Sequence, residues 1–493
     1  MKEKKISLST PIKKNQDNWF SRKIIVFLVC LFCIWFVIKS SAYLSHILST
    51  TKTTISTQTA NIISNTIGKS MQKDIHGNIN ILLIWYGGAK HQWWFLADSI
   101  IVASFDPKEY SVSMISIPRD LVVNSSGYIN RVNTIMAYSY NKHKDLDLAV
   151  QSLSNKVSEI TSLEIPYYAL IDFNGFAALV DKIWGIDVYV PKRVYDSTYP
   201  GPNYSYTIFS INSGQQHLNG TVALKYARSR HSSSDFSRSQ RQQLIIKALI
   251  EKMTNQGLSI NTINNIYATY KEYVHTNITL DEMLWLLAYG KTIPEMHSFG
   301  LTMECSNNSR KTMQAWCFLY PVDSTQFGGM SGILPIWASI GKISYYDLIQ
   351  TFSDLVSHNQ WYLNEKNPIR IYNAIDKTYA KKFAYRDQIA NKLWAKLKKY
   401  GFLVNQIENA PSSSSGTTII ITGTGEYKNT VETLRSFFTI DAIQLNPATV
   451  DLSGNALPNS VDIYLGNTFA DQFASKPFNF YLPNAQQYNT QKL

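Results

Sequence analysis

The chain has 493 residues, of which 45% are hydrophobic and 13% aromatic, so it is long enough for two or three domains and too apolar to be mostly disordered. Its formal net charge is +12, but the first 23 residues alone hold seven Lys or Arg against two acids. The rest of the chain is only mildly basic, which argues against a dedicated nucleic-acid-binding protein.

The N-terminal region combines a basic tail, residues 1–23, with one long apolar run. Residues 24–38 are uninterrupted and apolar, and with residues 39–44 the run approaches the ~20 residues that span a bilayer. Because Lys and Arg precede it, the positive-inside rule predicts a single transmembrane anchor at 24–44 with the N-terminus in the cytoplasm. A cleaved signal peptide is the alternative, but no small-residue cleavage site follows the run. Everything from about residue 45 onward is then expected outside the cytoplasm.

Residues 45–76 are rich in Ser, Thr, Ile and Asn, and we interpret them as a juxtamembrane stalk. The first globular domain then begins with predicted strands at 79–85, 99–105 and 112–117. The turn sequence at 106–108 separates the second strand from the third and therefore indicates a hairpin.

Helical and extended patterns alternate through the rest of this domain. The sequence predicts, in chain order, a helix at 146–160, a strand at 167–172, a helix at 173–183, a strand at 187–190, a loop over 195–213, helices at 220–227 and 236–253, and further helices at about 257–273 and 281–291. Strands that alternate with helices around a hairpin indicate an α/β sandwich with a mixed sheet, which we place at residues 77–300.

Residues 301–365 show no recognisable chemistry and are interpreted as an insertion or linker with one helix at 344–356. They include Cys305 and Cys317, for which a disulfide and two free thiols both remain open.

A smaller α/β domain is predicted over residues 366–470, followed by a loose tail at 471–493. Its predicted elements are strands at 369–372, 402–406, 418–422 and 461–465, helices at 385–400 and 427–437, and a flexible link at 411–416.

The densest group of cations lies between residues 223 and 246. It consists of Lys225, Arg228, Arg230, Arg238 and Arg241, with Asp235 as the single acid. Arg238 and Arg241 fall in the first two turns of the predicted helix, where the helix dipole is already positive, so they cost stability unless an anion binds. Free N–H groups at a helix start, together with arginines, are typical of a phosphate or pyrophosphate site. A solvated basic surface is the plainer alternative.

Five segments of the first domain resemble the LytR–CpsA–Psr (LCP) family of bacterial cell-envelope enzymes, and they occur in the order of that family. The segments are NINILLI at 78–84, ADSIIVASFDPK at 97–108, SMISIPRDLVV at 113–123, YYALIDFNGFAALVDKIWGIDVYVP at 167–191 and HLNGTVALKYARSRHSSSDFSRSQRQQ at 217–243. Residues 369–468 also resemble the C-terminal domain that often accompanies this family.

The resemblance implies an α/β/α sandwich with phosphotransferase activity in cell-wall assembly. Such an enzyme moves a glycopolymer from a polyprenyl-pyrophosphate lipid carrier to peptidoglycan and forms a phosphodiester. The resemblance further implies Mg²⁺, an apolar tunnel for the lipid and the bacterial cell membrane as the location. No nucleic-acid partner is expected, because the chain beyond its N-terminal tail is only mildly basic. Phosphoryl transfer depends mainly on positioning and on neutralising phosphate charge, which arginine does well.

Matched position by position, the resemblance assigns roles to individual residues. It implies pyrophosphate binding by Arg119, Arg228, Arg230 and Arg238, a supporting acid and amide at Asp235 and Gln242, a Mg²⁺ ligand at Asp98, and supporting neighbours at Asp120 and Arg241. For Asp98 and Asp120, a purely local turn-forming role is the alternative.

Three positions depart from the family pattern: Tyr86 stands where the family has Asp, and Gly88 and Leu96 stand where it has Arg. One metal carboxylate and two arginines are therefore missing, although Mg²⁺ prefers hard anionic oxygens. Two hypotheses remain. The protein is an active transferase whose metal relies on Asp98 and the phosphates of the substrate, or it is a catalytically impaired envelope scaffold that binds the lipid-linked substrate without turnover.

Overall fold

The structure is a computed structural model that describes most of residues 71–475, all of which belong to one compact unit, Ser64–Leu493. The residues outside the description are 1–70, 89–94, 126, 202–204, 230–234, 256–271, 280, 284, 287–295, 302–318, 323, 336–337, 339–345, 359–360, 381–388, 424, 447–458 and 476–493. The predicted anchor, most of the stalk, Cys305, Cys317 and Arg230 thus lie outside the described residues. Within the part that is described, no helix is both long enough and apolar enough to cross a membrane.

A six-stranded mixed sheet in the order β11-β6-β1-β2-β3-β12 forms the centre of the first domain. Its strands are β1 (Ile79–Tyr86), β2 (Ala97–Asp106), β3 (Ser111–Ile117), β6 (Tyr167–Asp172), β11 (Val274–Thr276) and β12 (Met296–Gly300). Strand β2 runs antiparallel to β1 and β3, which confirms the predicted hairpin, whereas β6 is parallel to β1 and β12 is parallel to β3.

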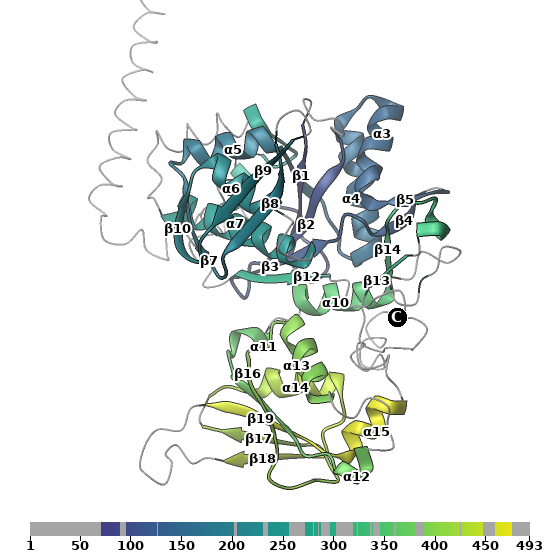
Figure 1. The fold of residues 1–493 in the computed structure, drawn as a ribbon, viewed down its shortest axis with the longest axis vertical. Helices are drawn as coiled ribbons and strands as arrows, with labels where there is room; N and C mark the ends of the chain where they lie inside the picture. The colour runs from purple at the N-terminus through teal and green to yellow at the C-terminus, as the bar shows by residue number, and fades with distance from the viewer. Residues whose placement is uncertain are drawn as a thin grey trace, which may run out of the picture. The chain divides into compact units, whose positions relative to one another are not determined.

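Helices pack on both faces of this sheet because successive strand residues point to opposite sides. Ile84 and Val102 lie in the core formed with α3 (Ile135–His143) and α4 (Leu146–Thr161). On the other face, Ile81 and Ile101 lie in the core formed with α5 (Phe173–Lys182), α6 (Gly220–Arg228) and α7 (Asp235–Asn255) (Figure 1). The predicted α/β fold with a central mixed sheet is confirmed.

Three of these helices begin at a residue whose side chain caps the first turn. The carboxylate of Asp145 accepts a hydrogen bond from the Leu148 N–H at 3.0 Å, and Asp172 accepts one from Gly175 at 2.6 Å. Asn219 does the same for Val222 at 2.9 Å. Each cap satisfies a backbone donor that the helix itself cannot pair, so these helix starts are fixed locally.

The predicted loop over residues 195–213 is wrong, because it contains most of a hairpin of β8 (Val194–Pro200) and β9 (Tyr206–Ile211). Phe209 and Ile211 are buried while Tyr206 and Ile208 are exposed, which is the pattern of a half-buried strand. The high Tyr content that suggested a loop is equally compatible with a strand. A further hairpin is formed by β4 (Val122–Ser125) and β5 (Tyr128–Arg131). β7 (Ile186–Val190) pairs antiparallel with β10 (Gly214–Leu218), and the β8–β9 hairpin lies between them in the chain.

The described part of 301–365 packs against the first domain. Helix α10 (Asp347–His358) contacts α4, β2 and β3, and its Phe352 is fully buried. The hydroxyl of Ser113 in β3 donates to the Val356 carbonyl at 2.5 Å, and the Asn78 amide donates to the Ser357 carbonyl at 2.7 Å. A hairpin of β13 (Leu319–Pro321) and β14 (Ile333–Pro335) also bridges to the first domain, through Ile333 and Leu121.

The C-terminal domain contains a five-stranded mixed sheet in the order β16-β15-β19-β17-β18. Its elements are β15 (Ile369–Asn373), α13 (Ile389–Lys399), β16 (Val404–Asn409), β17 (Thr418–Thr422), α14 (Lys428–Phe437), β18 (Ala442–Asn446), β19 (Ser460–Leu465) and α15 (Asn467–Ser475). Arg370 of β15 binds both carboxylate oxygens of Asp462 in the neighbouring β19, at 2.6 and 2.5 Å.

Two predictions for this domain are wrong. The loose tail begins too early, because α15 continues to Ser475 and buries Phe469 completely. The segment 411–416 is not a flexible link, since the Ser414 N–H donates to the Ala374 carbonyl at 2.7 Å and the Ser414 carbonyl accepts from Asn467 at 3.1 Å. A serine-rich composition suggested flexibility, but backbone pairing with residues distant in the sequence holds this segment in place.

Candidate active site

The C-terminal ends of β1 and β6 and the start of β2 meet at one edge of the central sheet. In the strand register, Tyr86 is paired with Asp172 on one side and with Ala97 on the other, so Asp98 lies beside this pair. Arg119 follows the end of the antiparallel neighbour β3 and approaches the same place. Polar residues from four separate segments therefore meet beyond the C-terminal ends of β1 and β6. Ligands of open α/β sheets bind in this position.

Charged side chains alternate along this edge. The Nη1 atom of Arg119 donates to Asp98 at 2.5 Å, and the Nε atom of Arg119 lies 3.7 Å from Asp120. Asp120 in turn accepts from the Nη1 atom of Arg131 at 3.3 Å. These side chains are only 18–30% exposed, so their attraction is screened less than that of a surface pair.

Arg131 was not singled out from the sequence, because only the β4–β5 hairpin brings the end of β5 back to Asp120. Within the part of the chain that the structure describes, the Nε atoms of Arg119 and Arg131 are buried without a hydrogen-bond acceptor. Buried donors normally have partners, so these two N–H groups remain available to an acceptor that the described protein does not supply.

Helix α7 supplies the next group of side chains. The Ser99 hydroxyl donates to the amide oxygen of Gln242 at 2.9 Å, which fixes α7 beside the start of β2 and hence beside Asp98. Arg238 is 8% exposed and lies four residues before Gln242, on the same face of the helix. The structure therefore places Asp98, Arg119 and Gln242 in one region, and Arg238 lies one helical turn before Gln242.

Arg241, on the same helix, has a different environment. Its Nε atom donates to the Tyr226 carbonyl at 2.9 Å, and its Nη2 atom donates to the Ser229 carbonyl. Burial lowers the pKa of the Arg241 guanidinium. These contacts hold the end of α6 against α7, so Arg241 positions the segment that carries Arg228.

Arg228 lies over the ring of Phe173, with the guanidinium carbon 4.1 Å from the ring centroid. Phe173 directly follows Asp172, so this cation–π contact keeps Arg228 near the end of β6. Arg230 and the side chain of Asp235 lie outside the described residues, and the structure does not place them.

The departures at Tyr86 and Gly88 have clear physical consequences. Burial raises the pKa of the Tyr86 phenol, and the charge of Asp172 adds to this, so Tyr86 is a neutral phenol rather than an anionic metal ligand. Gly88 has φ +81°, and a Cβ atom there would lie 2.8 Å from the Asp172 carboxylate. An arginine at position 88 would therefore be strained unless the Asp172 side chain shifts.

Asp172, which the sequence pattern predicts only as the end of a strand, is a second carboxylate at this edge. One oxygen caps α5, and the other is the atom nearest to the missing Cβ of Gly88. Asp98 keeps one carboxylate oxygen that Arg119 does not occupy. Mg²⁺ is commonly held by one or two carboxylates together with substrate phosphates. The free oxygens of Asp98 and Asp172 fit such an ion only if substrate phosphates supply its other ligands.

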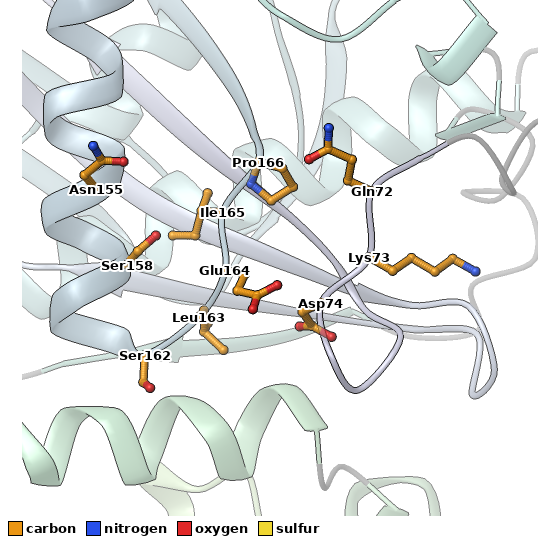
Figure 2. A pocket seen from close by; sticks show the side chains of 10 residues that line it. All are labelled: Gln72, Lys73, Asp74, Asn155, Ser158, Ser162, Leu163, Glu164, Ile165 and Pro166. Carbon is orange, nitrogen blue, oxygen red and sulfur yellow. The ribbon is translucent and has the colours of Figure 1, made fainter.

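A cavity of about 510 Å³ lies away from this edge, between the end of α4 and the segment before β1 (Figure 2). Its lining includes Gln72, Asp74, Asn155 and Glu164, so it is substantially polar and does not provide the expected apolar lipid tunnel. The tunnel remains a prediction.

Fold and site together define a class: a mixed α/β domain with a group of arginines at one end of its sheet, followed by a small α/β domain. The profile of the LytR_cpsA_psr family matches residues 43–326, and the profile described as LytR cell envelope-related transcriptional attenuator matches residues 367–469. Since the first match covers more than half of the chain, the protein belongs to the LytR_cpsA_psr family. The predicted resemblance is confirmed.

Curated relatives include transferases of the bacterial cell wall. The polyisoprenyl-teichoic acid–peptidoglycan teichoic acid transferase TagV of Bacillus subtilis is 35% identical over 192 residues, which is 38% of this chain and 47% of TagV. The transferase TagU of Bacillus licheniformis is 28% identical over 275 residues, 53% of this chain and 80% of TagU. The chain thus spans about half the length of TagV.

Solved structures of the same group also resemble the chain. That of B. subtilis TagV has 29% identity and a TM-score of 0.38, and it covers 48% of this chain and 87% of that one. A structure of TagT bound to LI-WTA has 21% identity and a TM-score of 0.39, and the match covers 54% of this chain and 87% of the TagT chain.

Proposed function

We propose that this protein transfers a glycopolymer of the teichoic acid type from a polyprenyl-pyrophosphate carrier to peptidoglycan, forming a phosphodiester. The observation that carries the proposal is the cluster of partly buried arginines at the sheet edge, in which Arg119 and Arg131 keep buried N–H donors oriented without a protein acceptor among the described residues. Family membership and the named activities of TagV and TagU support the same reaction.

The reaction suits these side chains. A hydroxyl oxygen of peptidoglycan forms a new bond to the phosphorus next to the glycan, its proton passes to a base, and polyprenyl phosphate leaves with the electrons of the broken P–O bond. Arg119 and Arg228 neutralise charge on the phosphate oxygens, and Asp98 holds Arg119 in position. Mg²⁺, when bound, adds further charge neutralisation, and Asp98 is the residue expected to hold it.

We also propose that residues 24–44 anchor the protein in the cell membrane with its domains outside the cytoplasm. The lipid carrier is membrane-bound, so an anchored enzyme meets its substrate at the membrane surface. Alkaline phosphatase fused after Leu493 tests the orientation, since that reporter is active only outside the cytoplasm. An inactive fusion of normal abundance would contradict the proposed topology.

The activity is tested with the full-length chain in detergent, a lipid-pyrophosphate-linked glycan, Mg²⁺ and peptidoglycan. We expect transfer by the wild type and a loss of about 10²–10³-fold in Arg119→Ala. Arg193→Ala is the matched control, because Arg193 is an exposed arginine whose guanidinium lies 5.9 Å from the Tyr195 ring on the β8–β9 hairpin. Equal activity in all three proteins would exclude the arginine edge as the site.

The second candidate function, a scaffold that binds the lipid-linked substrate without turnover, is favoured specifically by the neutral phenol of Tyr86. In that case the wild type binds the carrier and transfers nothing. Tyr86→Asp then restores a carboxylate without disturbing Gly88 and is expected to create measurable transfer. If the wild type already turns over at the rate of Tyr86→Asp, the scaffold function is excluded.

A further inference from the structure

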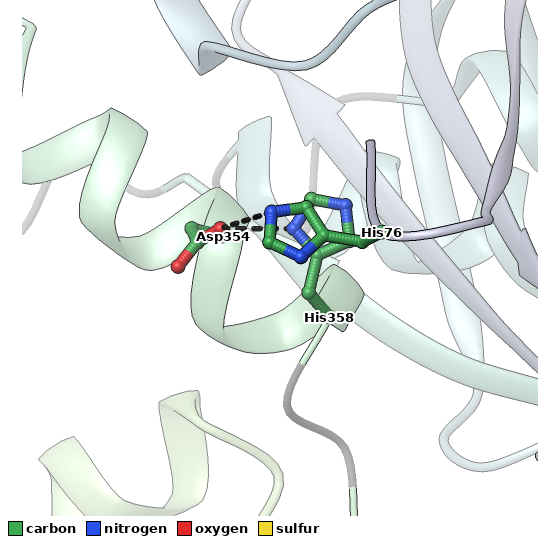
Figure 3. A group of neighbouring side chains, drawn as sticks. All are labelled: His76, Asp354 and His358. Atoms are coloured by element: carbon green, nitrogen blue, oxygen red, sulfur yellow. Dashed lines mark hydrogen bonds and ion pairs between the residues drawn. The ribbon is translucent and has the colours of Figure 1, made fainter. Parts of the chain in front are cut away.

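A group of metal-capable side chains lies outside the proposed transferase site and joins the segment before β1 to helix α10 (Figure 3). It consists of His76, Asp354 and His358, whose donor atoms all lie within 4.8 Å of one another. Asp354 and His358 are four residues apart on α10 and therefore share one face of the helix. His76 precedes α10 by more than half the length of the chain, so only the tertiary structure assembles the three.

The geometry converges on one oxygen of Asp354. The Nδ1 atom of His358 lies 2.9 Å from Asp354 Oδ1, and the Nε2 atom of His76 lies 4.0 Å from the same oxygen. The two imidazole rings are stacked, with centroids 4.0 Å apart. Ligands of a tetrahedral ion with bonds of about 2.0–2.2 Å lie roughly 3.3 Å from each other, so binding requires the exposed His76 to move closer to Asp354 and its ring to turn out of the stacked arrangement.

A second carboxylate orients the buried histidine. Asp74 Oδ2 lies 3.0 Å from His358 Nε2, on the opposite side of the ring from Asp354. Asp74 is itself fixed, because it accepts hydrogen bonds from the backbone N–H of Asn78 at 2.9 Å and from the Asn80 amide at 2.8 Å. Metal-binding histidines usually donate their other N–H to such a carboxylate, which leaves the first nitrogen free for the ion.

Exposure is graded across the group. The side chains of Asp74 and His358 are 3% and 6% exposed, whereas those of Asp354 and His76 are 32% and 45% exposed. The buried pair provides a rigid base, and the exposed pair leaves an entry path and room for a water molecule as a further ligand. This combination is typical of a three-ligand site with one open position.

We propose that His76, Asp354 and His358 form a binding site for a divalent transition-metal ion of the Zn²⁺ class, with Asp74 as the carboxylate that orients His358. Two imidazoles and one carboxylate select such an ion over Mg²⁺ or Ca²⁺, which prefer oxygen ligands throughout. The bound ion fastens the segment before β1 to α10. The site is separate from the arginine edge and does not depend on the transferase function.

Co²⁺ and Zn²⁺ titrations of the full-length chain, purified in detergent and treated with a chelator, test the site. We expect one equivalent of Co²⁺ to give the visible absorption bands of low-coordinate cobalt, and Zn²⁺ to displace it while Mg²⁺ does not. His76→Ala and Asp354→Asn are each expected to weaken binding by roughly 100-fold, because each removes a ligand.

His217→Ala is the matched control, since His217 is another exposed histidine paired with a carboxylate, that of Asp187 at 2.7 Å. The His217→Ala variant should bind Co²⁺ with the same affinity as the wild type. His76 is nearly half exposed, so circular dichroism should show His76→Ala folded even if a variant of buried His358 is not. The proposal is overturned if the wild type binds no more tightly than His76→Ala, which would leave a plain histidine–carboxylate ion pair, or if Mg²⁺ displaces Co²⁺.

Discussion

Two clusters of charged side chains in this protein carry opposite excess charge, one positive and one negative. At the sheet edge, Arg119 and Arg131 alternate with Asp98 and Asp120, and the further arginines 228 and 238 leave an excess of positive charge. At α10, two carboxylates surround His358, so that cluster needs a positive charge. The sign of the imbalance indicates the ligand: a phosphate-type anion at the first cluster, and a proton or metal ion at the second.

The largest expected effect comes from removing the carboxylate that positions Arg119. Asp98→Ala should lower kcat for transfer by about 10²–10³-fold, because both the orientation of Arg119 and the expected Mg²⁺ ligand are lost. Affinity for the lipid pyrophosphate should remain or increase, since the edge becomes more positive. Asp187→Ala, at an exposed carboxylate, is the control. A rise in KM with unchanged kcat would mean that Asp98 serves binding only.

In the metal-free protein, protonation of His358 in the second cluster should make the free energy of unfolding depend on pH. Burial lowers the pKa of His358, but its hydrogen bonds to Asp354 and Asp74 outweigh this and raise the pKa from 6.5 to about 9. The stabilisation is therefore complete below pH 6.5 and is lost as the pH rises through 9, on the order of 3 kcal/mol in total.

At the acidic end, burial raises the pKa of Asp74, but hydrogen bonds from His358, Asn78 and Asn80 lower it from 3.8 to about 2. The contribution of Asp74 is present above pH 3.8 and is lost as the pH falls through 2. Urea unfolding between pH 5 and 10 checks the histidine contribution. A His358→Gln variant with the same decline above pH 7 as the wild type would rule that contribution out.

A smaller effect, on the stability of the fold, is expected from replacing Gly88 beside the proposed anion site. Gly88→Ala should destabilise the fold by about 1–3 kcal/mol, because φ is +81° and the new Cβ would meet the Asp172 carboxylate at 2.8 Å. Gly127→Ala is the control, since Gly127 has φ +85° but has no atom within 4 Å of the Cβ position. Equal losses in the two variants would show that the contact with Asp172 costs nothing.

Much of the first domain was predictable from the sequence. The apolar runs of β1 and β3 and the helical spacing of α4 and α7 are local patterns, and the caps Asp145 and Asp172 act within three residues. The five family segments identified the family for the same reason, since each is a continuous stretch. β11 was missed because three residues carry too little pattern, and β12 was missed because its sequence, MHSFG, has no apolar run and no β-branched residue.

The sequence by itself determined the family and the α/β class, and it predicted Asp98, Arg119 and Gln242 as parts of one site. Only the tertiary structure decided that Arg131 and Asp172 join the sheet edge, that α10 packs on the first domain, and that His76 meets Asp354 and His358. Periodicity and caps act between residues a few positions apart and so remain visible in the chain. Contacts across tens or hundreds of residues depend on strand register and helix docking, which no local pattern specifies.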